Sequence, residues 1–191
     1  MKLYFDYDNN YEYEETKTKF RNDIKYNILK RKNKKEIFDI VFLCIGTDKL
    51  TGDSFGPLVG TILENQIKRN NISNINIYGT LEKNISYTNV KEVIKLIGSR
   101  HPNSYIITID AALSDKNNIG KIFVEEGKTI IGKGLNKEKI EVGDLSIKGV
   151  IGKKSRIPQN NFYILQNTSL NRVIKLADIV SEGLLDIVEL I

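Results

Sequence analysis

The sequence has few of the residues that most often carry catalysis or bind metals. Its 191 residues include one cysteine, one histidine, one methionine, three prolines and no tryptophan. A single cysteine excludes an internal disulfide framework and a cysteine-rich zinc site. Any catalytic or metal-binding imidazole must be His101, the only histidine. Most of the chemistry must therefore rest on other residue types.

Long hydrophobic runs are also absent. No window approaches the roughly 18 apolar residues of a membrane-spanning helix. The first 20 residues are acidic and rich in tyrosine, without the apolar core of a secretion signal. We therefore expect a cytoplasmic protein with no membrane partner. The net charge is only +5 and no basic stripe alternates with aromatic residues, so we expect no nucleic-acid partner.

Residues 1–36 differ in composition from the rest of the chain. Tyrosines alternate with acids and amides at the start, and residues 25–35 are strongly basic. Ile24, Ile28 and Leu29 form a weak helical stripe. We interpret residues 1–36 as an N-terminal arm or helix lying on one domain, 37–191. A docking, regulatory or pro-segment role is the alternative.

The domain begins with alternating strand-like and helix-like segments. An apolar run at 37–45 predicts a strand buried on both faces, and 74–81 and 105–109 predict two more. Helically spaced apolar residues predict helices within 59–67 and 90–97. This β-α-β-α-β order is typical of an α/β sheet with right-handed crossovers.

The pattern changes after residue 120 to shorter strands separated by glycine-rich turns. We expect these strands at 121–124, 129–131, 144–151 and 162–165. Regularly spaced apolar residues over 168–190 predict a long amphipathic closing helix. We see no internal repeat or linker. The chain is therefore predicted to form a three-layer α/β/α domain with a mostly parallel, mixed sheet.

Two aspartates follow strands that we expect to be neighbours. Asp53 lies in the turn after the first strand, and Asp110 at the end of the third. Ligands of open parallel sheets bind beyond the carboxyl ends of the strands, where the strand order switches. If the third strand lies beside the first, both carboxylates face that crevice. An aspartate buried there needs a partner, a metal or a proton.

Several roles are open to this pair. The carboxylates can share a proton, one acting as base and the other as acid on water. They can instead bind a divalent cation, and Asp53 and Asp110 are then its ligands. Each can also be structural, with Asp53 as a helix N-cap and Asp110 bonded to the following backbone amides. We expect no cofactor.

Other catalytic arrangements fall at unsuitable positions. A phosphate loop has four residues between its glycines and then a lysine, whereas Gly46 and Gly52 enclose five and Asp53 follows. His101 precedes the third strand, so it lies at the opposite edge of the sheet and is interpreted as a surface turn residue. Cys44 lies inside the first strand, where a thiol is normally a buried hydrophobe. Carboxylates are left to carry the chemistry.

The segment around Asp53 resembles the signature of the YyaC-type sporulation proteins, a family described as spore proteases of endospore-forming bacteria. The signature comprises Cys44-Ile45-Gly46-Thr47-Asp48 and Thr51-Gly52-Asp53-Ser54-Phe55-Gly56-Pro57-Leu58-Val59-Gly60. Shorter matches follow at Tyr78-Gly79-Thr80-Leu81, Ile109-Asp110-Ala111, Val142-Gly143-Asp144 and Leu165-Gln166-Asn167-Thr168. The resemblance spans about 37–190 and leaves the N-terminal arm uncovered.

That family is similar to the spore germination protease and, more distantly, to hydrogenase maturation proteases, which implies a phosphorylase/hydrolase-like α/β fold. In the germination protease, Thr-x-Asp-x-Leu-Gly-Pro and a later Asp-Ala supply two essential aspartates. Asp53 and Asp110 stand in those places, so the resemblance implies catalytic roles for both. Residues expected to contact substrate or support the pair are Asp48, Thr51, Ser54, Asn89 and Asp144. No histidine is placed to bind nickel as in the hydrogenase maturation proteases.

The resemblance implies an endopeptidase of sporulation or germination. We expect it to hydrolyse peptide bonds of spore proteins, with Asp53 and Asp110 activating water, inside the forespore or spore. Its partner would be a protein or peptide substrate, and the oligomeric state is not indicated. The alternative is a non-enzymatic binding or regulatory sporulation protein on the same fold.

Overall fold

A central sheet of five strands organises the computed structural model, which describes residues 10–32, 39–70, 72–132 and 138–188. The strands are β1 (Asp39–Cys44), β2 (Ile75–Tyr78), β3 (Ser104–Ser114), β4 (Ile122–Glu126) and β7 (Leu145–Lys153). Their order is β2-β1-β3-β7-β4. All neighbours are parallel except β4, which pairs antiparallel with β7. The predicted mixed, mostly parallel sheet is therefore confirmed.

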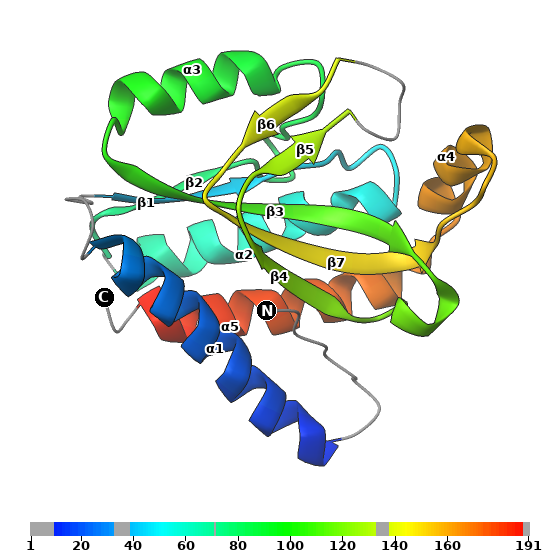
Figure 1. Ribbon diagram of the computed structural model, residues 1–191, viewed down its shortest axis with the longest axis horizontal. Coiled ribbons are helices and arrows are strands. Elements are labelled where there is room, and N and C mark those ends of the chain that lie inside the picture. Colours follow the sequence, from blue (N-terminus) through cyan, green and yellow to red (C-terminus); the bar gives the residue numbers. More distant parts are fainter. Residues whose placement is uncertain (1–9, 33–38, 71, 133–137, 189–191) are drawn as a thin grey trace.

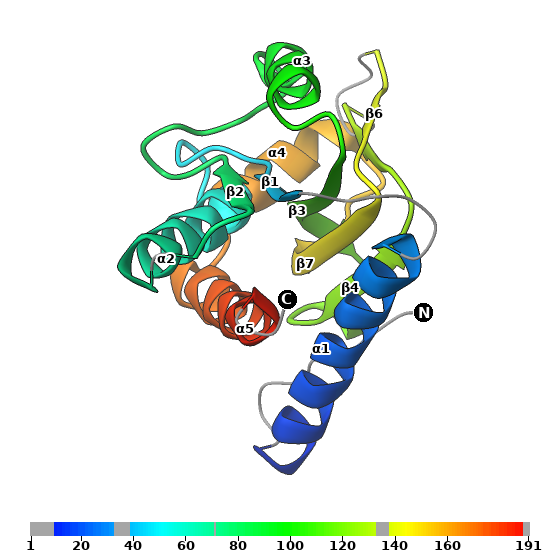
Figure 2. The ribbon, with the colours of Figure 1, turned by 90° about the vertical axis from the view of Figure 1, so that its left-hand side faces the viewer.

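Helices cover both faces of this sheet (Figures 1 and 2). On one face lie α1 (Asn10–Lys32), α2 (Phe55–Asn70) and α5 (Leu170–Val188). The other face carries α3 (Val90–Arg100) and a small sheet of β5 (Thr129–Ile131) and β6 (Ile140–Val142). The remaining elements are α4 (Pro158–Gln166) and two 3₁₀ turns, η1 (Gly52–Ser54) and η2 (Lys116–Asn118). The layers form the predicted α/β/α arrangement.

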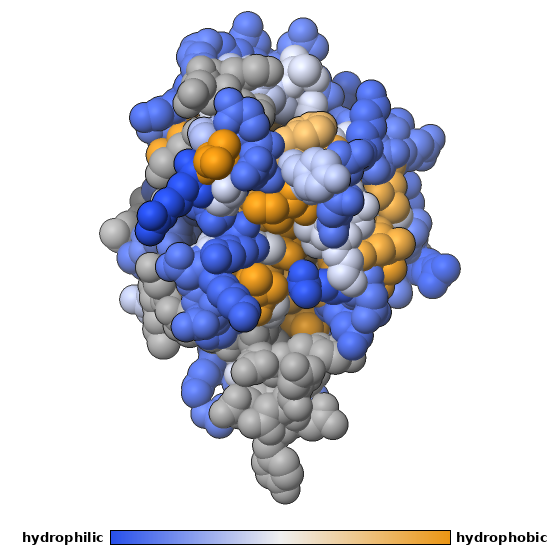
Figure 3. Space-filling view, turned by 90° about the vertical axis from the view of Figure 1, so that its right-hand side faces the viewer, coloured by the Kyte–Doolittle hydropathy of each residue, from blue (hydrophilic) through white to orange (hydrophobic). Residues whose placement is uncertain are grey.

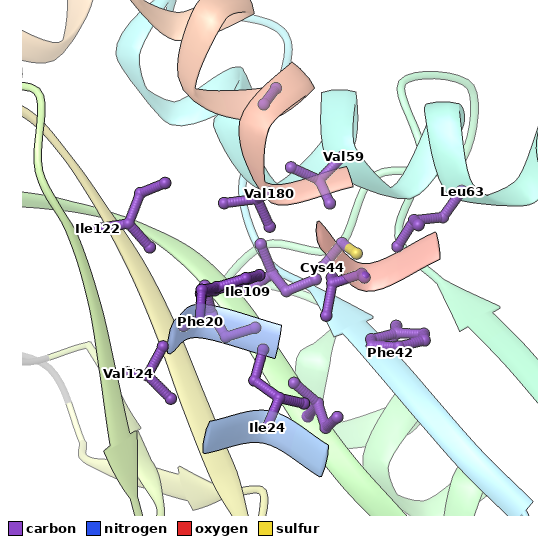
Figure 4. Close-up of a cluster of buried hydrophobic side chains, with 14 of the residues drawn as sticks. Phe20, Ile24, Phe42, Cys44, Val59, Leu63, Ile109, Ile122, Val124 and Val180 are labelled. Atoms are coloured by element: carbon purple, nitrogen blue, oxygen red, sulfur yellow. The ribbon is translucent and has the colours of Figure 1, made fainter. Parts of the chain in front are cut away.

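The first strand is apolar throughout because both of its faces are covered. Phe42 and Cys44 belong to the core against α2 and α5, whereas Val41 and Leu43 belong to the core beneath α3. Figure 4 shows the first of these cores, with Cys44 among the side chains of the surrounding helices. Burial raises the pKa of the Cys44 thiol. Cys44 is thus a packing residue, as predicted.

Helix α1 contributes an apolar stripe to the core. Phe20, Ile24 and Ile28 recur every four residues and are each at most 1% exposed. Leu29, expected in the stripe, is exposed instead. Phe20 packs on Gly183 of α5, where an added Cβ would lie 2.6 Å from the ring. The described part of the N-terminal segment is therefore a layer of the fold.

Two expected strands differ from the structure. The segment 162–165 lies inside helix α4, because Pro158 starts a helix there and a four-residue apolar run suits either element. Strand β3 runs on to Ser114 instead of ending at Ile109, because β7 pairs with it over its whole second half. Residues 1–9 and 33–36 of the expected arm lie outside the described residues.

Candidate active site at the strand-order switch

The strand order switches between β1 and β3. From β1 the chain crosses to β2 on one side, and then to β3 on the other. β1 ends at Cys44, which pairs with Ile109. Asp110 is therefore the first residue of β3 beyond the end of β1, although it is not at the end of its own strand. This placement confirms that the third predicted strand lies beside the first.

Two close backbone approaches hold Asp53 at the open end of β1. A Cβ added to Gly46, which has a φ of 142°, would lie 1.9 Å from the Asp53 carbonyl oxygen. A Cβ on Gly56 would lie 2.2 Å from the Ile45 carbonyl oxygen. Only glycine allows these contacts. The turn that carries Asp53 is thereby packed against the end of the sheet.

Asp53 and Asp110 lie close enough for their charges to interact. Burial, followed by the negative charge of Asp53, raises the pKa of Asp110 from the usual 3.8 to about 7. Burial also raises the pKa of Asp53, and the nearby backbone N–H of Thr47, which donates to the Asp53 carbonyl oxygen at 3.2 Å, opposes this effect. Two neighbouring carboxyl groups with raised pKa values retain a proton near neutral pH. The pair can therefore supply both an acid and a base.

A lysine beside the pair limits this effect. Lys148 of β7 pairs in register with Asp110 of β3, and its Nζ forms an ion pair with Glu125 Oε2 of β4 at 3.1 Å. The Lys148 charge lowers the pKa of Asp110, though less than burial and Asp53 raise it. Neither Lys148 nor Glu125 was a predicted site residue. The available signal was a lysine inside an otherwise apolar strand, because a cation there needs a partner.

Thr51 and Ser54 lie in the same turn as Asp53. The Ser54 hydroxyl is buried and donates to the Thr51 carbonyl oxygen at 2.7 Å. This bond closes the turn, so Ser54 shapes the site from within the protein. Thr51 is half-buried and begins the turn.

Asp48 and Asn89 are connected through the loop that precedes α3. The exposed Asp48 carboxylate accepts a hydrogen bond from Asn84 Nδ2 at 3.1 Å. Asn89 accepts from the Ser86 backbone N–H and donates to the Asn84 carbonyl oxygen. Asp48 is therefore exposed on the loop that follows β1. The side-chain amide of Asn89 instead stabilises the loop before α3 through its bonds to Ser86 and Asn84.

Asp144 lies away from the pair, which corrects its expected position. Its carboxylate accepts a hydrogen bond from the Ile106 backbone N–H at 3.0 Å and pairs with Arg31 of α1 at 3.4 Å. Ile106 precedes Asp110 on β3 by about 13 Å of strand. Asp144 thus links β3, β7 and α1 at the amino end of the sheet and does not face the crevice.

His101 also lies at the amino end of the sheet, as predicted, but it is not a free surface residue. Its Nδ1 lies 2.9 Å from Asp39 Oδ2 and its Nε2 lies 3.0 Å from the Tyr78 hydroxyl. The side chain is 14% exposed. The imidazole therefore connects the end of α3 to β1 and β2.

The donor set around the pair is small for a metal site. Among the described residues, no three His, Cys, Asp or Glu side chains are grouped as metal ligands. Asp53 and Asp110 alone would supply fewer protein ligands than the three typical of a catalytic zinc. These residues therefore do not fit a tightly held zinc or nickel ion.

Within the described ranges, no helix is long and apolar enough to span a membrane.

Comparison with known proteins identifies the family. A solved structure of a NiFe hydrogenase maturation protease, HycI from Thermococcus kodakarensis KOD1, aligns with a TM-score of 0.45 and 18% identity. The alignment covers 78% of this chain and 94% of that one. The uncharacterized protein YyaC of Bacillus subtilis (strain 168) is 37% identical over 145 residues, covering 76% of this chain and 67% of YyaC. Residues 8–183 match the family described as "Protein of unknown function (DUF1256)". The resemblance to YyaC is thus confirmed, and the chain belongs to the DUF1256 family.

Proposed function

We propose that this protein is an endopeptidase in which Asp53 and Asp110 share a proton and activate water. One observation carries the proposal: at the strand-order switch, the charge of Asp53 helps to raise the pKa of Asp110 to about 7. A structural aspartate is normally stabilised in its ionised form by a cation or several N–H donors. This pair instead favours a state that keeps one proton, which is the state acid–base catalysis needs.

The chemistry follows from that shared proton. The ionised Asp53 removes a proton from water as the water oxygen attacks the peptide carbonyl carbon. The protonated Asp110 donates its proton to the carbonyl oxygen, which forms a tetrahedral intermediate. Asp53 then gives its new proton to the amide nitrogen and Asp110 takes one from a hydroxyl of the intermediate, so that the C–N bond breaks and leaves a carboxylic acid and an amine. One water is consumed for each peptide bond, and the pair regains its single proton.

Lys148 and Glu125 adjust the charge state of this pair. The ammonium group favours the ionised form of Asp110, and Glu125 partly neutralises the ammonium group. Burial and Asp53 raise the pKa of Asp110 and Lys148 partly opposes them, which leaves it near 7, where an acid is most effective at physiological pH.

Spore proteins are the proposed substrates, inside the forespore or spore. The motif around Asp53 resembles that of the germination protease, and the relative YyaC shares 37% identity. Both aspartates are half-buried and lie beyond the end of β1, the position at which open parallel sheets bind their ligands.

The proposal is tested by incubating the full-length protein with an extract of spore proteins and mapping new N-termini by mass spectrometry. We expect fragments from the wild type and none from Asp53→Asn, Asp110→Asn or the double variant. Glu92→Gln, which removes an exposed carboxylate on α3, is the matched control and should retain cleavage. Cleavage by the double variant would refute the mechanism. Activity that is lost in EDTA and restored by one divalent cation would instead support a metal-dependent hydrolase.

A further inference from the structure

A long stretch of the chain near the site carries only positive charge. Residues 145–177 contain six Lys and Arg residues and no Asp or Glu. Three of these cations, Lys153, Lys154 and Arg156, are exposed on the segment between β7 and α4. Among the ion pairs of the described residues, none includes any of the three. The neighbouring turn adds Asp115 and Lys116, whose charges cancel.

Apolar side chains are exposed just before α4 and on α4 itself. Ile157 is 56% exposed, Phe162 55% and Tyr163 68%. Figure 3, which views the end of the molecule that carries α4, shows hydrophobic residues gathered among hydrophilic ones. The other side of α4 is not free, because Ile164 packs on Gly152. Exposed aromatic residues beside unpaired cations are typical of binding surfaces.

This surface adjoins the turn that carries Asp53. A Cβ added to Gly52 would lie 3.0 Å from the Leu165 carbonyl oxygen and 3.1 Å from Thr168 Oγ1. The residue before Asp53 therefore touches the end of α4. A polypeptide bound along α4 would reach the pair within a few residues, at about 3.3 Å per extended residue.

We infer that residues 153–163 form a docking surface for an acidic stretch of polypeptide that contains apolar residues. Its Asp and Glu side chains would pair with the three cations, and its apolar side chains would cover Phe162 and Tyr163. The exposed amides of Gln159, Asn160 and Gln166 offer donors and acceptors for peptide groups. Binding at this surface does not depend on the proposed function; only the cleavage of the bound polypeptide rests on it.

Binding is measured in the full-length Asp53→Asn/Asp110→Asn variant, so that no cleavage interferes. The probes are three fluorescent peptides of equal length with the same apolar centre, flanked by Glu, by Gln or by Lys. We expect the Glu peptide to bind at least about tenfold more tightly than the Lys peptide, with an affinity that falls as salt increases.

Two sets of substitutions locate the surface. Lys153→Glu/Lys154→Glu/Arg156→Glu and, separately, Phe162→Ser/Tyr163→Ser should each weaken binding of the Glu peptide by about tenfold. Lys95→Glu/Leu96→Ser on α3 removes one exposed cation and one exposed apolar residue from the other face of the sheet, and should leave binding unchanged. Circular dichroism checks that each variant is folded; if one substitution set prevents folding, the other still tests the surface.

Equal binding of all three peptides, no binding, or binding unaffected by both α4 variants would overturn the inference. Tighter binding of oligothymidylate or of phosphatidylglycerol vesicles through the same residues would also overturn it, in favour of a nucleic acid or a membrane. Peptide binding without cleavage by the wild type would leave the docking surface standing and refute the peptidase. Cleavage of all three peptides at equal rates by the wild type would support the peptidase and refute the docking surface.

Discussion

The two ends of the central sheet hold aspartates in contrasting environments. At the amino end, Asp144 pairs with Arg31 and accepts a backbone hydrogen bond, and Asp39 pairs with His101. At the carboxyl end, Asp53 and Asp110 interact with each other, and their pKa values are raised. The residue type is the same, but the partner decides the role. Carboxylates paired with a basic side chain hold the fold together, whereas two interacting carboxyl groups with raised pKa values are suited to acid–base catalysis.

Removing each carboxylate in turn gives the largest expected contrast. Asp53→Asn and Asp110→Asn should each lower peptide cleavage by about 100- to 10,000-fold, because the acid or the base is lost. Asp144→Asn should keep most of the activity and instead lower the free energy of unfolding by about 1–3 kcal/mol. Initial rates and urea unfolding of the three variants check this. A large loss of activity in Asp144→Asn, with stability unchanged, would contradict the contrast.

Stability should depend on pH through Asp110 at the carboxyl end of the sheet. The folded-state pKa of Asp110 is raised above its unfolded value, so the proton stabilises the folded state at low pH. That contribution is lost as the pH rises from about 3.8 through about 7. Asp110→Asn should therefore stabilise the protein at pH 8 relative to the wild type, on the order of 1–3 kcal/mol. Thermal unfolding at pH 5 and pH 8 measures the difference; destabilisation at pH 8 would show that ionised Asp110 is structural.

The charge of Lys148 should set the alkaline limit of activity. Lys148→Met removes the charge that lowers the pKa of Asp110, so activity should persist to higher pH. Glu125→Gln releases Lys148 from its ion pair and should move the limit to lower pH. The pH dependence of the cleavage rate for both variants is the measurement. Shifts in the same direction for both would refute this role.

The imidazole at the amino end should have the smallest effect. His101→Gln weakens the links to Asp39 and Tyr78, which should cost about 1 kcal/mol of unfolding free energy. Cleavage at a permissive temperature should be unchanged, because the imidazole lies at the other edge of the sheet. Chemical denaturation and cleavage rates test this, and loss of cleavage in a stable variant would place His101 in the mechanism.

Much of the fold could be predicted because its signals are local. The apolar run of β1 and the helical spacing after it define a parallel α/β unit, and they place Asp53 and Asp110 at the strand-order switch. The strand predicted at 162–165 was wrong, because a four-residue apolar run suits a strand or a helix and this one lies in α4. The contacts of this helix with Gly52 and Gly152 are made by residues distant in the sequence, so no local pattern could reveal them.

The parts of the site that were missed depend on register. Lys148 became a neighbour of Asp110 only through the pairing of β3 with β7, which no local pattern specifies. Asp144 was misplaced for the same reason, since it precedes β7 and lies level with Ile106. His101 gained its partners from β1 and β2. A short motif can mark a residue as unusual, but the strand register decides what it faces.

The most direct test of a shared proton is a carbon-13 NMR titration of the Asp110 carboxyl group in the wild type and in Asp53→Asn. In the wild type, Asp110 should titrate with a pKa of about 7. In Asp53→Asn its pKa should fall, because the neighbouring negative charge is gone. An Asp110 that titrates near 3.8, or whose pKa is unaffected by Asp53→Asn, would contradict the pair as an acid and base.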